Sequence, residues 1–229
     1  FIKMLCEQGY EYVTIHNADA LVANLRRQLE LLNNCRFTDK EWDSFFKNKI
    51  ANANEGIVEK TRKIQEEYVQ NLTREDGRTL NITLIDKKNI HNNRLQVINQ
   101  YAETSGNHDA RYDVTILVNG LPLVHVELKR RGVAIKEAFN QIDRYQRDSF
   151  WAGCGLYEYV QIFVISNGTS TKYYSNTTRV SHIKENEGTG RKRGKKTSNS
   201  FEFTSYWADG NNKVIADLVD FTKTFFAKH

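Results

Sequence analysis

Residues 111–131 read RYDVTILVNGLPLVHVELKRR, and this stretch decides the fold expected for the chain. Residues 114–118 and 121–128 are rich in Val, Ile and Leu, and Asn119-Gly120 between them is a strong signal for a β-hairpin. Charged groups are rarely left at the end of a buried strand pair unless they bind a metal or pair with one another. Three such residues stand at the open end of this hairpin: Asp113, Glu127 and Lys129.

The turn of the hairpin decides whether the three charged side chains share a face. Side chains two positions apart leave a strand on the same face, so Glu127 and Lys129 lie together, roughly 7 Å apart along the chain. A plain two-residue turn would pair Asp113 with Val126 and place the Asp113 carboxylate on the opposite face. The carboxylates would then be unable to bind one metal ion.

A turn with an odd number of residues changes this arrangement. With residues 118–120 as the turn and the glycine in the left-handed conformation, Asp113 pairs with His125 and Arg111 pairs with Glu127. All three charged side chains then share a face. The sequence therefore predicts an odd-length turn or a β-bulge in this hairpin.

The chemistry of the three side chains fits phosphodiester hydrolysis. Two carboxylates within a few Å repel each other, and a hard divalent cation such as Mg²⁺ relieves that repulsion while accepting oxygen ligands. Lys129 cannot bind the metal, but it can hold the attacking water and offset charge on a phosphorane-like transition state. A structural alternative fits the same spacing: Asp113 caps a turn, and Glu127 pairs with Lys129 or Arg111 at a sheet edge.

A helix is expected after the hairpin, over residues 133–150, because apolar residues recur there at helical spacing. Gln141 and Tyr145 are four residues apart and therefore neighbours on one helix face. Their amide and phenol groups could hydrogen-bond a phosphate or orient a metal ligand. The alternative is that Tyr145 belongs to the apolar core stripe and Gln141 borders it.

The D…ExK pair followed by QxxxY resembles the PD-(D/E)xK nuclease superfamily in its RecB-like branch. The chain resembles more closely the N-terminal nuclease domain of the motor and restriction (R) subunit of type I restriction enzymes. The likeness runs from about Leu21 to the final helix, and its long ungapped blocks are more specific than the catalytic spacing. These blocks are LRRQLELLN, LQVINQ, RYDVTILVNGLPLVHVELKRRG, KEAFNQIDRYQRDSF and QIFVISNGTSTKYYSNTTR.

The resemblance implies an α/β fold with a restriction-endonuclease-like mixed β-sheet flanked by helices. It implies that Lys129 serves the water and that Gln141 with Tyr145 forms the pair specific to this branch. The implied catalytic residues are Asp113, Glu127, Lys129, Gln141 and Tyr145. The implied Mg²⁺ ligands are Asp113, Glu127 and the backbone carbonyl of Leu128.

Two features of the family pattern are not matched by a single obvious residue in this sequence. Tyr112 stands where the superfamily often has proline, a common departure that leaves the resemblance intact. The branch also uses an acidic residue on an early helix. The sequence does not choose among three candidates: Glu30, Glu41 and Glu59.

The function implied by the resemblance is Mg²⁺-dependent endonucleolytic cleavage of double-stranded DNA. ATP-driven translocation would come from motor domains outside this chain, and ATP would act only through them. The methylation and specificity subunits would be partners and would choose the target. Two alternatives stay open: a non-catalytic DNA-binding or assembly module of the same fold, and a motor-independent repair or resolvase-type nuclease.

Composition agrees with these expectations. A chain of 229 residues can form one domain with a proper core, and its mean hydropathy of −0.63 indicates much polar surface. No apolar run approaches the roughly 20 residues of a membrane span. The net charge of +5 favours a polyanionic partner only weakly. The three widely spaced cysteines are expected to be free thiols in a reducing cytoplasm: Cys6, Cys35 and Cys154.

We expect one nuclease domain over residues 1–229, with a helical front over residues 17–70. Asn17 or Asp19 is expected to cap the first helix of this front, and Thr38 with Glu41 fits a capping box at the second. The sheet core with the catalytic motifs is expected over residues 78–180, and a C-terminal helix over residues 212–228.

A basic stretch separates the expected sheet core from the last helix. Residues 184–200 have little to bury, and we expect a mobile loop there. Five of its side chains could contact DNA phosphates or could simply be solvated. They are Arg191, Lys192, Arg193, Lys195 and Lys196.

Overall fold

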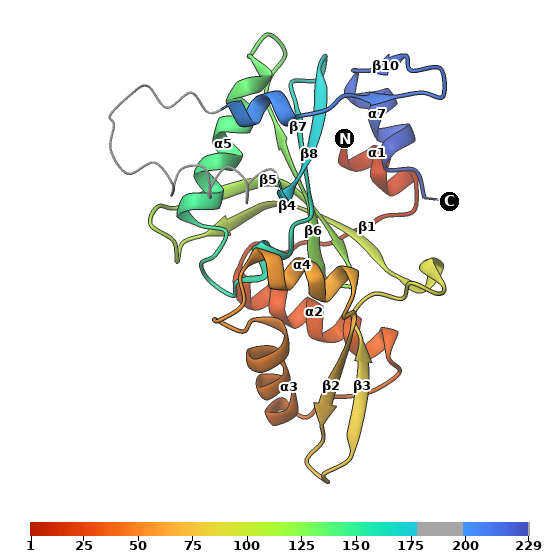
Figure 1. Ribbon diagram of the computed structural model, residues 1–229, viewed down its shortest axis with the longest axis vertical. Helices are drawn as coiled ribbons and strands as arrows, with labels where there is room; N and C mark the ends of the chain where they lie inside the picture. Colours follow the sequence, from red (N-terminus) through yellow and green to blue (C-terminus); the bar gives the residue numbers. More distant parts are fainter. Residues whose placement is uncertain (178–198, 229) are drawn as a thin grey trace.

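A mixed six-stranded sheet with helices on both faces forms the centre of the molecule (Figure 1). The computed structural model describes residues 1–177 and 199–228. In spatial order the strands are β1 (Glu11–Tyr12), β4 (Leu95–Glu103), β5 (Ala110–Val118), β6 (Leu121–Leu128), β7 (Ile162–Ser166) and β8 (Thr171–Ser175). The β1–β4 and β6–β7 pairs are parallel and the other neighbours are antiparallel. The expected α/β fold with a mixed sheet is confirmed.

Helices cover the sheet on both faces because each buries one apolar stripe against it. The larger core lies between the sheet and the helices α2 (Ala18–Leu32), α3 (Asp39–Phe45) and α5 (Ile135–Asp148). The smaller core contains residues of α1 (Ile2–Glu7) and α7 (Leu218–Phe225), which lie side by side near both chain ends (Figure 1). These two helices, distant in sequence, close the second face of the sheet.

The remaining elements are short. The small antiparallel hairpins are β2 (Val69–Thr73) with β3 (Thr79–Thr83), and β9 (Trp207–Ala208) with β10 (Val214–Ile215). The helical segments are α4 (Ile57–Gln65), the π-helix η1 (Phe46–Ile50), and the 3₁₀ turns η2 (Ile90–Asn92), η3 (Leu156–Tyr159) and η4 (Asn199–Phe203). None of the helices in the described ranges combines the length and apolar character that a bilayer span requires.

The two expected helix starts are confirmed. The Asn17 side chain accepts a hydrogen bond from the backbone N–H of Ala20 at 2.9 Å, so Asn17 is the N-cap of α2. At α3, Thr38 and Glu41 exchange the two hydrogen bonds of a capping box, at 3.2 and 3.0 Å. These contacts are local, which is why the sequence alone could predict them.

The β5–β6 hairpin contains the expected bulge. Its turn is two residues long, with both φ angles positive: 50° at Asn119 and 84° at Gly120. The register then shifts between Leu117 and Ile116, so that β6 contributes one extra residue, Leu123. The prediction of a bulge is therefore confirmed, whereas the alternative of a three-residue turn is wrong.

The bulge changes which residues face each other. Thr115, not Asp113, pairs with His125, so that expected pairing is wrong. The observed register ends with Val114 opposite Val126. Continuing this register by one residue places Asp113 opposite Glu127 on the neighbouring strand. The convergence predicted from the sequence thus arises from a two-residue turn plus a bulge.

Two residues explain this hairpin geometry. Pro122, the only proline in the chain, stands next to the bulge and has no N–H to donate to a regular ladder. Gly120 contacts α2 so closely that an added Cβ would lie 2.6 Å from the Cα of Leu25. A side chain at position 120 would push α2 away from the sheet.

Two expected boundaries differ from the structure. The helical front ends at Gln65 instead of residue 70, and the next strand begins at Val69 in a separate two-stranded sheet. The C-terminal helix begins at Leu218 instead of residue 212, because the Asp209 side chain accepts from two backbone N–H groups and closes the β9–β10 turn. Asp217 then caps the helix. Most of the expected basic loop, up to residue 198, lies outside the described residues.

Candidate active site

The two acidic side chains lie next to each other on β5 and β6, toward the open end of the hairpin and away from its turn. Glu127 is fully buried on β6 and Asp113 is partly buried on β5. Asp113 Oδ2 accepts a hydrogen bond from the backbone N–H of Leu128 at 2.9 Å. This bond ties the carboxylate of one strand to the backbone of the other, directly beside Glu127.

A hydrogen-bonded chain of side chains connects the strand end to α5. Lys129 Nζ donates to Glu127 Oε1 at 2.9 Å and to Gln141 Oε1. Gln141 Nε2 donates to the hydroxyl of Tyr145, which donates to the backbone carbonyl of Arg111 at 2.8 Å. The structure therefore brings together the five residues expected to be catalytic: Asp113, Glu127, Lys129, Gln141 and Tyr145.

Tyr145 is both a core residue and a member of the hydrogen-bonded chain, the two alternatives that the sequence left open. Its ring is 9% exposed and packs against Tyr112 with centroids 4.9 Å apart, so it belongs to the core. Its hydroxyl nevertheless reaches Gln141. Burial, and then the charge of Glu127, raise the pKa of Tyr145 to about 12, above the ordinary value of 10.0, so the phenol is protonated and able to donate at neutral pH.

Electrostatic repulsion between the acids is visible at Asp113. Burial first, and then the nearby charge of Glu127, raise the pKa of Asp113 above its ordinary value. The Leu128 N–H and the Lys129 ammonium act in the opposite direction without cancelling this effect. A cation placed between the carboxylates would favour their charged forms.

The residues present fit a hard divalent metal ion. Glu127 Oε2 is buried and has no hydrogen-bond partner within the described part of the chain, so one carboxylate oxygen is available. No group of three or more His, Cys, Asp or Glu side chains suited to a metal occurs in residues 1–177 and 199–228. Mg²⁺ suits such a sparse set, because it usually binds one or two carboxylates and keeps several waters.

Two surface hollows lie beside the hydrogen-bonded chain that joins Lys129 to Tyr145. One, of about 480 Å³, is lined by Leu128, Lys129 and Gln141 among others. The second, of about 380 Å³, is lined by Arg111, Gln141 and Tyr145 among others. Gln141 lies in the walls of both hollows, whereas Lys129 lines only the first.

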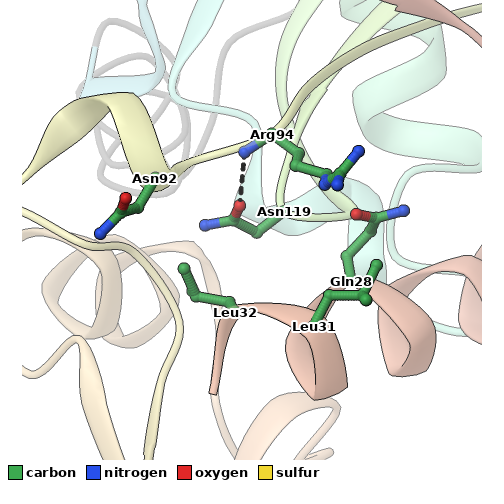
Figure 2. Close-up of a pocket in the computed structure, with 6 residues that line it drawn as sticks. All are labelled: Gln28, Leu31, Leu32, Asn92, Arg94 and Asn119. Atoms are coloured by element: carbon green, nitrogen blue, oxygen red, sulfur yellow. Dashed lines mark hydrogen bonds between the residues drawn. The ribbon is translucent and has the colours of Figure 1, made fainter. Parts of the chain in front are cut away.

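A third pocket, of about 370 Å³, lies at the turn end of the same hairpin. Figure 2 shows the Asn119 side chain there, with its oxygen accepting from the backbone N–H of Arg94 at 2.8 Å. Its lining contains no carboxylate, so it offers no site for the metal discussed above. The lining residues are Gln28, Leu31, Leu32, Asn92, Arg94 and Asn119.

Comparison with known proteins identifies the family of the chain. Residues 1–182 match the family described as type I restriction enzyme R protein N terminus, which is well over half of the chain. The chain belongs to this family. The family resemblance inferred from the sequence is thereby confirmed.

Individual relatives of the R protein family agree. The chain is 51% identical over 229 residues to the type I restriction enzyme EcoprrI endonuclease subunit of Escherichia coli, and the match covers 100% of this chain and 68% of the relative. It is 38% identical to the SsaAORF53P endonuclease subunit of Staphylococcus saprophyticus and 36% identical to the SauCOLORF180P endonuclease subunit of Staphylococcus aureus. These two matches each cover 98% of this chain and 22% of the relative.

The structure does not identify the early-helix acidic residue that the RecB-like branch leads us to expect. Glu30 is paired with Arg36 at 2.7 Å, and Glu41 is paired with Arg74 at 3.1 Å. Glu59 accepts a hydrogen bond from the backbone at the start of α4. Each of the three candidates therefore makes structural contacts of its own.

Sequence reasoning missed one residue that lies beside the candidate site. His125 is fully buried on β6, and its Nε2 lies 3.6 Å from Glu127 Oε2. Its position two residues before Glu127 was the available signal, because strand residues two apart share a face. The sequence analysis used His125 only as a marker of register.

The repulsion at Asp113 predicts a pH-dependent stability in metal-free buffer. Because the pKa of Asp113 is raised in the folded state, its contribution to stability is present below the unfolded-state pKa and is lost as the pH rises through the folded-state pKa. Asp113→Asn removes this loss and keeps an oxygen that can accept from Leu128. We expect the variant to melt on the order of a few °C higher than the wild type at pH 7 to 8.

Circular dichroism melting curves measured across pH would check this prediction. The difference in Tm should shrink as the pH falls toward 3.8, the ordinary pKa of an aspartate. Asp43→Asn, at an exposed position on α3, is the matched control and should change little. A variant less stable than the wild type at pH 7 to 8 would contradict the prediction.

Proposed function

We propose that the chain is the Mg²⁺-dependent nuclease domain of a type I restriction enzyme R subunit and that it cleaves the phosphodiesters of double-stranded DNA. The observation that carries the proposal is the buried carboxylate pair, Asp113 and Glu127, with an unpartnered oxygen beside the ammonium of Lys129. Relatives named as endonuclease subunits support the same reaction class.

Asp113, Glu127 and the backbone carbonyl of Leu128 are the proposed metal ligands. When bound, Mg²⁺ would offset the charge of the carboxylates and polarise a phosphoryl oxygen. Asp113 is suited to this role because burial and the nearby charge of Glu127 disfavour its charged form, and Glu127 is suited because its Oε2 has no hydrogen-bond partner among the described residues. Water and phosphate oxygens would complete the ligand set.

Lys129 is proposed to hold the attacking water and to offset negative charge that develops on the phosphate. Its ammonium can do both because it sits on a flexible stem and is oriented by two hydrogen bonds, which Nζ donates to Glu127 and Gln141. Gln141 and Tyr145 position that ammonium through the chain of hydrogen bonds that ends at the β5 backbone. In this proposal they orient Lys129 and perform no proton transfer themselves.

Cleavage is proposed to depend on delivery of DNA by an ATP-driven motor elsewhere in the R subunit. Methylation and specificity subunits would supply target choice, and the reaction would take place in the cytoplasm. The three cysteines are free in the structure, as expected for a reducing compartment. Length supports the involvement of other domains, because the staphylococcal relatives are more than four times as long as their matched segments.

The test is metal dependence, measured in two ways. Titration of the chain with Mn²⁺, followed by electron paramagnetic resonance, should show binding that Asp113→Ala and Glu127→Ala each weaken at least about tenfold. In the full-length subunit with its partners and ATP, EDTA should stop cleavage of double-stranded DNA and Mg²⁺ should restore it.

Two results would contradict the proposal. A wild-type chain that binds no Mn²⁺ while still binding DNA would be a docking module with a vestigial site. Metal-dependent cutting by the chain alone, without ATP or other subunits, would instead identify a motor-independent nuclease.

A further inference from the structure

His125 is a polar residue in an otherwise aromatic environment. Its side chain is fully buried on β6. Four rings surround the imidazole at centroid distances of 5.5 to 6.5 Å, with interplanar angles of 71° to 79°. They belong to Tyr112, Tyr145, Phe150 and Phe163. This edge-on packing holds the ring plane in one orientation.

Three buried polar atoms without hydrogen bonds lie together at this place. They are Nδ1 and Nε2 of His125 and Oε2 of Glu127, none of which has a partner among the described residues. Buried polar atoms are nearly always hydrogen-bonded, since leaving them unpaired is costly. Three in two adjacent side chains therefore require an explanation.

The two side chains can satisfy each other with a small movement. Nε2 of His125 lies 3.6 Å from Oε2 of Glu127. A shift of roughly half an ångström brings this distance into the 2.7–3.2 Å range of an N–H···O hydrogen bond. The aromatic rings leave the imidazole little freedom, so the carboxylate is the group that turns.

We infer that His125 is a positioning residue whose Nε2–H donates to Glu127 Oε2 and orients the carboxylate for metal binding. Lys129 holds the other carboxylate oxygen, so the two donors together determine the plane of the Glu127 carboxylate. Each carboxylate oxygen has two lone-pair positions, which lets Oε2 accept this bond and still bind a cation. Donors that orient metal-binding side chains in this way tune metal affinity.

This inference rests on the proposed metal site but adds a residue that contacts neither metal nor DNA. It also specifies a tautomer, with the proton on Nε2 and none on Nδ1. An imidazole protonated only at Nδ1 would have no proton on Nε2 to donate to Glu127 Oε2. The tautomer and the metal affinity are therefore two independent measurements of the same contact.

The affinity experiment compares two substitutions of similar shape. His125→Gln keeps an N–H donor, whereas His125→Met fills similar space without one. We expect Mn²⁺ binding to weaken about 10–100-fold in His125→Met and to stay within about threefold of the wild type in His125→Gln. Phe221→Leu is the packing control: this fully buried side chain belongs to the smaller core on the other face of the sheet, so the change should lower Tm without changing Mn²⁺ affinity.

The tautomer experiment needs no substitution. Long-range ¹H–¹⁵N correlation spectra of the wild-type chain, labelled at histidine, should show the His125 ring protonated at Nε2 only, with and without Mg²⁺. A ring protonated at Nδ1 alone would overturn the inference. This measurement remains decisive if His125→Met does not fold.

The outcomes separate this inference from the proposed function. Wild-type Mn²⁺ binding with unchanged affinity in His125→Met overturns the role of His125 and leaves the metal site in place. Equal weakening in His125→Gln and His125→Met also overturns it, because the donor would then be irrelevant. Absence of Mn²⁺ binding in the wild type overturns both proposals.

Discussion

Replacing Glu127 with alanine in the full-length R subunit is expected to reduce DNA cleavage by at least about 10³-fold while ATP hydrolysis continues at the wild-type rate. Glu127 is the more buried of the two acids and lies within contact of Lys129 and His125. Its loss removes a proposed metal ligand and one of the groups that holds Lys129. Asp113→Ala is expected to have the same effect on cleavage.

Cleavage of double-stranded DNA and ATP hydrolysis would be measured on the same complexes. Asp43→Ala removes an exposed carboxylate on α3 and should leave both activities unchanged. Glu127→Gln keeps the shape of the side chain and removes its charge, so a loss of cleavage there separates charge from packing. Loss of ATP hydrolysis together with cleavage would show that Glu127 is part of the scaffold and not of the reaction.

Substitution of Lys129 should separate catalysis from metal binding. Lys129→Ala is expected to lower the rate of cleavage about 10²–10³-fold, because the ammonium is proposed to stabilise charge on the phosphate. Mn²⁺ affinity should change much less than the cleavage rate, because the loss of an orienting hydrogen bond to Glu127 is offset by removal of a positive charge beside the carboxylates. The change therefore affects a step after metal binding.

Single-turnover cleavage rates at saturating Mg²⁺, together with Mn²⁺ titrations, would check this expectation. Lys129→Arg keeps the charge but replaces a compact ammonium with a planar guanidinium, so we expect it to restore little activity. Lys47→Ala, at an exposed position in η1, is the matched control. Metal affinity lost in parallel with cleavage would mean that Lys129 holds the site together and has no separate role.

The candidate site was predictable because its parts are close in sequence. Glu127, Leu128 and Lys129 are consecutive, and Gln141 and Tyr145 are one helical turn apart. Strand and helix periodicity therefore specify their relative directions without knowledge of the rest of the fold. Helix caps such as the one at Asn17 were predictable for the same reason.

The elements predicted least well depend on contacts that are distant in sequence or on turns with special hydrogen bonds. The C-terminal helix lost its first turns to the β9–β10 hairpin, which the Asp209 side chain closes. The buried position of His125 depends on rings from β5, β7 and α5 and the segment after α5. No local pattern in β6 predicts that these four aromatic rings surround His125.

By itself the sequence determined the hairpin, its Asn119-Gly120 turn and the requirement for an irregular register if Asp113 and Glu127 were to meet. Only the tertiary structure decided how the register shifts, with a two-residue turn and a bulge beside Pro122. The physical reason is that side-chain periodicity and turn chemistry are local properties of the chain. The site of a bulge depends also on neighbouring elements, as where Gly120 packs against the backbone of α2 at Leu25.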